Sequence, residues 1–140
     1  MQREWVRQRI ARRRLALFAA GALVVAVGLA VHFQAGGTAA SLAADALYAA
    51  LVYLIVAFLA PRSAPVRVAA TAAGLCVVVE LFQLTGVPSL LAEAWPPTAL
   101  VLGTTFVAWD LVAYLVGAAL AGLADRMVSS CATVRAARGR

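Results

Sequence analysis

The sequence predicts an all-α integral membrane protein, a four-helix bundle with both termini in the cytoplasm. Of its 140 residues, 64% are hydrophobic and only 13% are charged, whereas a soluble domain is nearer half apolar and a quarter charged. Mean hydropathy is +0.92. Four apolar runs are each long enough to cross ~30 Å of hydrocarbon. The net charge of +6 comes from arginines that flank these runs, so we expect no nucleic-acid partner.

Residues 1–14 form a basic N-terminal segment with six arginines and one acid, Glu4. We interpret it as a topology signal that holds this end in the cytoplasm. The alternative is direct contact with anionic lipid, at about 1 kcal/mol per arginine near the surface. The candidate membrane-surface residues are Arg9, Arg12, Arg13, Arg14, Arg62, Arg67 and Arg126.

A four-span transmembrane domain is predicted over residues 15–123. Its spans are residues 15–33, 42–60, 66–87 and 105–123. We expect Pro61 to end the second span and Pro88 to end the third, because proline cannot continue a helix. Small residues that permit close helix packing occur in the first and fourth spans. They are Gly21 and Gly28, and the pairs Gly117-Ala118 and Ala121-Gly122.

The longest connection, residues 88–104, is expected to hold a short interfacial helix over Ser89–Trp95. Ser89 is its predicted N-cap, and Trp95 is placed at the headgroup level. Residues 98–103 are apolar but too short to cross, so they either dip into the membrane or lie on it. Residues 124–140 are predicted to be a basic, partly disordered cytoplasmic tail.

The distribution of arginines determines the orientation. Six lie in the N-terminal segment, two in the second connection and four in the tail, and the other two connections have none. The positive-inside rule therefore places both termini and the second connection in the cytoplasm. We expect a multi-pass protein of the bacterial inner membrane that contacts anionic lipid on its cytoplasmic face.

This orientation brings three carboxylates to one depth. Asp45, Glu80 and Asp110 fall about 5–10 Å below the outer boundary, at ~1.5 Å per helical residue. A second polar side chain follows each acid by three or four residues and shares its helix face. The only histidine lies in the same layer. The candidate ligand-binding site is Asp45, Tyr48, Glu80, Gln83, Asp110, Tyr114 and His32.

Such polar faces should point inward, because lipid cannot satisfy them. No arginine lies in this layer. If the acids converge, either a bound cation balances them or at least one carries a proton, with Glu80, the deepest, as the first candidate. The alternative is a purely structural network that holds the helices together, at about 0.6 kcal/mol per hydrogen bond.

Motifs for soluble chemistry are missing from the sequence. It contains no P-loop, HExxH, CxxC or GxSxG pattern. One histidine and two distant cysteines do not form a zinc site. We therefore expect no metal and no cofactor, and we lean against an enzyme.

Three segments carry a family resemblance: ELFQ at Glu80–Gln83, LGTTF at Leu102–Phe106 and WDLVAYLVG at Trp109–Gly117. With DALYAALVYLI at Asp45–Ile55, they make residues 12–125 resemble the DUF2809 family of small bacterial membrane proteins. The chain is more distantly similar to VanZ-like proteins, although it lacks their arginine after the Glu-x-x-Gln. It also has Pro96-Pro97 where DUF2809 proteins often have a basic residue. VanZ-like proteins are linked with glycopeptide resistance at the cell surface, and this implies a role with envelope lipids or peptidoglycan precursors.

Three functions remain open from the sequence. The first is binding or handling of an envelope lipid or small ligand in the outward-facing polar site. The second is an accessory or structural subunit of a homo-oligomer or larger membrane complex, with the small-residue faces as partner surfaces. The third is a membrane enzyme or proton-coupled carrier that uses the carboxylates.

Overall fold

The computed structural model describes residues 2–138, with side chains described for residues 4–130. The regular structure in this part is entirely helical. Its long helices are α1 (Gln2–Gln34), α2 (Thr38–Leu59), α3 (Pro65–Gln83) and α6 (Ala108–Arg138). Each of the four is long and apolar enough to cross a membrane. The predicted all-α, four-span membrane architecture is confirmed.

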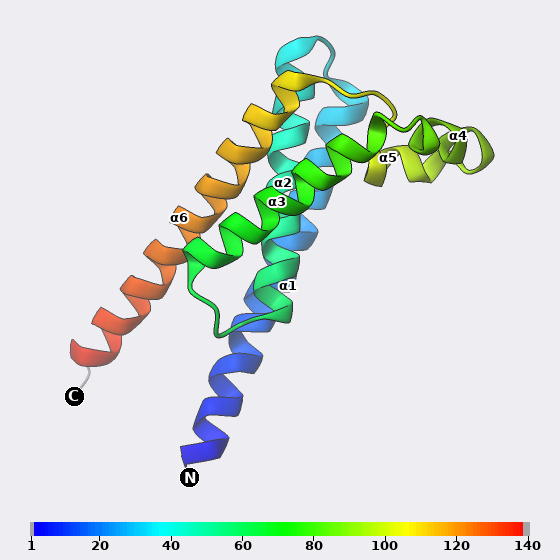
Figure 1. Cartoon of the computed structure of the whole chain (residues 1–140). Coiled ribbons are helices and arrows are strands. Elements are labelled where there is room, and N and C mark those ends of the chain that lie inside the picture. The colour runs from blue at the N-terminus through cyan, green and yellow to red at the C-terminus, as the bar shows by residue number, and fades with distance from the viewer. Residues whose placement is uncertain (1, 139–140) are drawn as a thin grey trace.

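Helix α2 is the centre of the bundle. It packs against α1, α3 and α6, and α3 also packs against α6. Helix α1 is peripheral, because within the described chain its backbone neighbours belong to α2. The start of α1 and the end of α6 lie toward the same end of the molecule (Figure 1).

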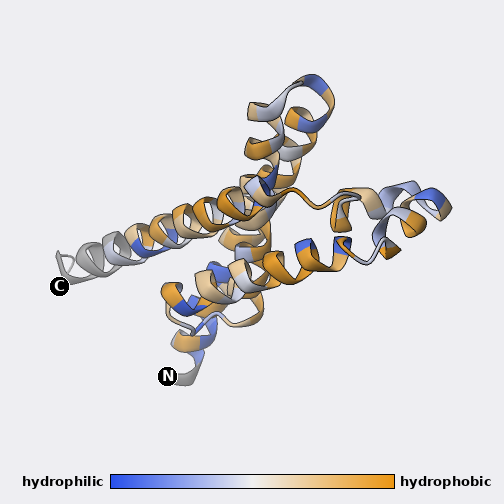
Figure 2. Cartoon of the chain, turned by 45° about the horizontal axis from the view of Figure 1, so that its top comes forward, coloured by the Kyte–Doolittle hydropathy of each residue, from blue (hydrophilic) through white to orange (hydrophobic). Residues whose placement is uncertain are grey.

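The interior of the bundle is built largely from alanine. Ala49, Ala57 and Ala72 are fully buried and Ala118 is nearly so, and these small side chains let the helices approach closely. Large apolar residues such as Leu120 point outward, with 60% of their surface exposed. Figure 2 shows hydrophobic colouring along the middle of the helices and hydrophilic residues toward their ends. An apolar surface this extensive is suited to lipid.

The connection after α3 forms a side arm, consisting of α4 (Val87–Ala94), η1 (Pro96–Thr98) and α5 (Ala99–Leu102). This α4–α5 arm projects sideways from the bundle (Figure 1). Helix α3 ends at Gln83, earlier than predicted, because Gly86 turns the chain with a φ of 72°. Pro88 does not end the third span. It lies in the first turn of α4, where a missing N–H costs little.

Several helix boundaries differ from the sequence prediction. Ser89 does not cap α4, because the helix begins at Val87 with Gly86 as its N-cap. The Ser89 hydroxyl donates to the Gly86 carbonyl at 2.7 Å. The basic N-terminal segment is helical from Gln2 and continuous with the first span. The predicted tail continues α6 as a helix to Arg138, and residues 139–140 lie outside the described part. The fourth long helix begins at Ala108, because residues 103–107 form an irregular segment.

Candidate functional site

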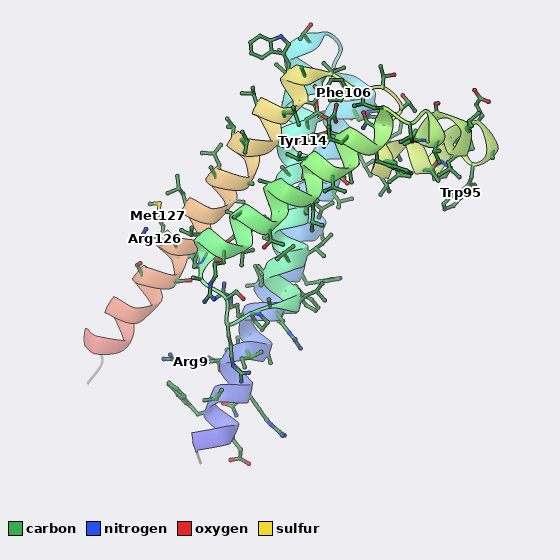
Figure 3. The ribbon with its side chains drawn as sticks, in the orientation of Figure 1. Arg9, Trp95, Phe106, Tyr114, Arg126 and Met127 are labelled. Atoms are coloured by element: carbon green, nitrogen blue, oxygen red, sulfur yellow. The ribbon has the colours of Figure 1, made fainter. Side chains whose placement is uncertain are left out.

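The predicted polar residues come from helix ends that meet at one end of the bundle. His32 closes α1, Asp45 lies near the start of α2, Gln83 ends α3 and Asp110 lies in the first turn of α6. Figure 3 places Tyr114 toward this end and Arg9 and Arg126 toward the opposite end. Within this shared layer, the structure divides the predicted residues into two groups.

Glu80 belongs to the first group and is completely buried. The backbone N–H of Val107 donates to its Oε1 at 2.7 Å. The Tyr114 hydroxyl donates to its Oε2 at 3.1 Å. Both carboxylate oxygens therefore have partners, one from the irregular segment before α6 and one from α6 itself. This pairing joins α3 to the start of the fourth long helix.

Gln83 makes the neighbouring link from α3. Its side chain is 8% exposed, and its Nε2 donates to the Leu102 carbonyl at 2.8 Å. Gly103 follows with a φ of +65°, and a Cβ there would collide with the Gln83 amide. The Gln83 Oε1 is buried and has no hydrogen-bond partner. We refer to Glu80, Gln83 and Tyr114, with the Leu102 and Val107 backbone groups, as the polar network.

Tyr48 lies beside the polar network and contacts it through its aromatic ring. Its ring centroid is 6.1 Å from that of Tyr114, with a tilt of 56° between the rings. This distance is within the range of favourable aromatic pairing. Tyr48 and Tyr114 thus connect α2 with α6 through a packing contact between their rings.

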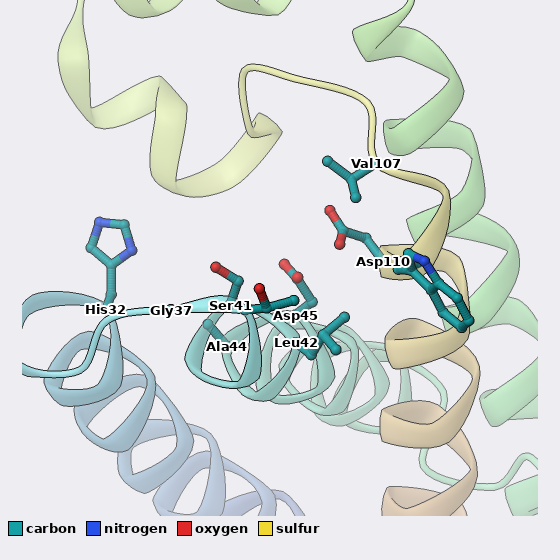
Figure 4. A pocket seen from close by; sticks show the side chains of 10 residues that line it. His32, Gly37, Ser41, Leu42, Ala44, Asp45, Val107 and Asp110 are labelled. Atoms are coloured by element: carbon teal, nitrogen blue, oxygen red, sulfur yellow. The ribbon is translucent and has the colours of Figure 1, made fainter.

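Asp45 and Asp110 form the second group, in an open pocket of about 470 Å³. Their carboxylates project toward the same space from α2 and α6 (Figure 4). The two side chains are close enough to interact with each other. The pocket is lined by ten residues: His32, Gly37, Thr38, Ser41, Leu42, Ala44, Asp45, Val107, Trp109 and Asp110. We refer to it as the acidic pocket.

His32 lies at the edge of the acidic pocket, on the end of α1 (Figure 4). Its side chain is exposed, and its ring stacks edge-to-face on Phe33 with centroids 5.0 Å apart. The pocket also includes two hydroxyl-bearing residues, Thr38 and Ser41. The sequence prediction left both outside the spans, in the connection formed by residues 34–41. Ser41 lies about one helical turn and Thr38 about two turns before Asp45, so this spacing on one helix face was the available signal.

A further polar cluster, which the sequence did not indicate, lies toward the opposite end of the bundle. The Arg13 Nη2 is 2.7 Å from the Asp125 Oδ2, and the Tyr53 hydroxyl donates to the same oxygen at 2.8 Å. Tyr53 is fully buried. The three side chains come from α1, α6 and α2. Asp125 lies two residues after the end of the predicted fourth span, so we assigned it to the predicted tail.

The described residues include no group of three His, Cys, Asp or Glu side chains close enough to hold a metal ion. The acidic pocket instead offers two carboxylates, two hydroxyls and one imidazole. These groups accept and donate hydrogen bonds and attract positive charge. The arrangement is suited to binding a polar, cationic group.

The model of a family described as "Protein of unknown function (DUF2809)" matches residues 35–118, more than half of the chain. The chain belongs to the DUF2809 family. In this DUF2809 protein, the match includes Asp45, Asp110 and the whole polar network, but neither His32 nor the Arg13–Asp125 pair. No curated protein and no solved structure matches the chain.

Proposed function

We propose that this DUF2809 protein binds an amine-bearing group in the acidic pocket, at the outer face of the bacterial inner membrane. The ligand is an envelope lipid with an amine headgroup or a small amine with the same chemistry. The proposal uses the predicted orientation, with both termini in the cytoplasm. The distant similarity to VanZ-like proteins supports a role at the cell envelope.

The observation that carries the proposal is the convergence of Asp45 and Asp110 on one open pocket. No arginine or lysine is among the residues that line it. Two neighbouring carboxylates repel each other, and a bound cation removes that repulsion. An ammonium group also supplies three hydrogen-bond donors for the oxygens around it. The pocket volume of about 470 Å³ is within the range of small-molecule sites.

Glu80 has a different role in this proposal. Its two oxygens already accept hydrogen bonds from Val107 and Tyr114, and it is fully buried. It therefore supports the pocket by holding the segment that carries Val107, a pocket-lining residue. This separates a structural acid from two ligand-facing acids within the predicted site.

The proposal is tested by native mass spectrometry of the full chain taken from nanodiscs of defined composition. We expect phosphatidylethanolamine to be retained in preference to phosphatidylcholine, whose headgroup has no N–H donor. Asp45→Asn and Asp110→Asn should each remove this preference by about tenfold or more, as for a hydrogen bond to a charged group. The control is Glu93→Gln, which changes an exposed acid on the α4–α5 arm.

Added ethanolamine distinguishes the two ligand sources. If ethanolamine displaces the lipid, the pocket recognises the amine alone. If it does not, recognition needs the lipid chains as well. Equal retention of both lipids, unchanged in the two aspartate variants, together with no binding of ethanolamine, would contradict the proposal.

A second candidate function, a subunit of an oligomer or larger complex, is favoured by the position of α1. This helix packs along α2 and leaves most of its surface uncovered. A Cβ at Gly28 would meet nothing within 4 Å, so this small residue is free for a partner helix. The small residues of the fourth span are not free, because Gly117, Ala118 and Gly122 are buried inside the bundle. Mass photometry of the protein in nanodiscs would reveal a complex, and Gly28→Leu should weaken it.

A further inference from the structure

The structure separates three consecutive arginines of α1 that the sequence cannot distinguish. Arg13 is paired with Asp125 at 2.7 Å. The Nε of Arg14 donates to the Phe58 carbonyl at 3.3 Å, and its guanidinium lies 5.3 Å from the centre of the Phe58 ring. Arg12 is exposed, and no described residue contacts its guanidinium by a hydrogen bond or ion pair. Arg13 and Arg14 thus hold the bundle together, whereas Arg12 is free.

These two contacts also bring three further arginines, from α6 and from the turn between α2 and α3, to the level of Arg12. The Arg13–Asp125 pair places α1 beside the part of α6 that carries Arg126. The Arg14–Phe58 contact places α1 beside the end of α2, where the turn to α3 carries Arg62 and Arg67. Arg12, Arg62, Arg67 and Arg126 are all exposed. We refer to Arg12, Arg62, Arg67 and Arg126 as the arginine collar.

The residues next to the arginine collar identify its surroundings. Leu59 is 70% exposed, Val66 71% and Met127 69%. Val66 directly precedes one collar arginine, and Met127 directly follows another. Exposed apolar side chains beside unpaired arginines are typical of the boundary between hydrocarbon and headgroups, where long basic side chains reach the polar layer. Such apolar neighbours favour a lipid surface over an acidic protein.

We propose that the arginine collar binds the phosphates of anionic phospholipids, and that Arg13 and Arg14 take no part in this binding. The guanidinium fork matches phosphate oxygens in a bidentate geometry. Asp125, the acid at this level, is already neutralised by Arg13. The collar therefore presents four uncompensated positive charges on the side of the bundle opposite the acidic pocket. This inference does not depend on what the acidic pocket binds.

Neighbouring residues in the chain provide the test. The full protein is placed in nanodiscs that contain phosphatidylglycerol and phosphatidylcholine, and the retained lipids are counted by native mass spectrometry. The variant Arg12→Gln/Arg126→Gln should lower the preference for phosphatidylglycerol by about fivefold for each arginine removed. Arg13→Gln removes one positive charge at the residue next to Arg12. It should nevertheless keep the preference for phosphatidylglycerol and lower thermal stability instead.

Two outcomes would overturn the inference. One is an equal loss of preference in Arg13→Gln and Arg12→Gln, because net charge alone would then explain lipid binding. The other is an unchanged preference in the Arg12→Gln/Arg126→Gln variant. If that variant is not recovered folded, Arg67→Gln carries the same expectation at an exposed position in the first turn of α3.

Discussion

Gly117 of α6 packs directly against the backbone carbonyl of Ala46 in α2. A Cβ at position 117 would collide with that carbonyl, so only glycine permits this approach. Helices α2 and α6 are packed along their length in the bundle. The contact places Tyr114, one turn before Gly117, where it reaches Glu80. A close helix crossing thus sets the position of the polar network.

The Gly117 contact predicts a strong effect of one methyl group. Gly117→Ala should lower the free energy of unfolding by about 1–3 kcal/mol, as for overpacked interiors. Gly28→Ala is the matched control, because a Cβ there meets nothing within 4 Å and alanine is the better helix former. Unfolding in mixed detergent and SDS micelles measures both. Equal stability of the two variants would show that α2 and α6 do not depend on this contact.

The hydrogen bonds of Glu80 predict an order of stability among its variants. Glu80→Leu leaves the Val107 N–H and the Tyr114 hydroxyl unpaired, and each buried unsatisfied group costs about 1–3 kcal/mol. Glu80→Gln retains an acceptor oxygen and should lose less. Asp110→Asn should unfold like the wild type, since Asp110 faces the open pocket. The same unfolding assay applies, and equal losses for the leucine and glutamine variants would refute a hydrogen-bonding role.

The conformation of Gly103 predicts a separate loss of stability at the α4–α5 arm. Its φ of +65° is disfavoured for other residues, and a Cβ would strike the Gln83 amide. Gly103→Ala should therefore cost about 1–3 kcal/mol of strain and loosen the arm, seen as faster hydrogen exchange at residues 87–102. Adding Gln83→Ala should recover only the part of this cost that comes from the clash with the Gln83 amide, and not the part that comes from the positive φ. Gly36→Ala, in open space, is the control and should show wild-type exchange.

The Arg13–Asp125 pair predicts a coupling between α1 and α6. Arg13→Gln should destabilise by about 1–3 kcal/mol, between the values for exposed and buried pairs, because the two side chains are 30% and 13% exposed. The double variant Arg13→Gln/Asp125→Asn should lose less than the sum of the single changes. Arg12→Gln should leave stability unchanged. Strictly additive losses in a double-mutant cycle would show that the pair does not tie the helices.

Part of the candidate site was predictable from the sequence because charge inside an apolar run is expensive and therefore conspicuous. Asp45, Glu80 and Asp110 stand out for this reason, and their common level follows from helix rise and topology. Their division into a polar network and an acidic pocket was not predictable. It depends on the irregular segment 103–107, in which the Val107 N–H donates a hydrogen bond to Glu80. The backbone path of this segment leaves no periodic pattern in the sequence.

The helix boundaries also could be predicted only in part from the sequence. Pro88 was expected to end the third span, yet it lies in the first turn of α4, because proline is compatible with both the end and the start of a helix. Arg13 and Arg12 look alike in the sequence. Only the rotation of α1 against α2 turns one toward Asp125 and the other outward.

The sequence by itself determined that this is a four-helix membrane protein with a polar layer, because burial of apolar surface in lipid depends on composition and run length. Only the tertiary structure decided which acid is paired, which two acids line the pocket and which arginines remain free. Those assignments depend on contacts between residues far apart in the chain, such as Glu80 with Tyr114 and Arg13 with Asp125. Such contacts follow from helix packing, which local patterns do not encode.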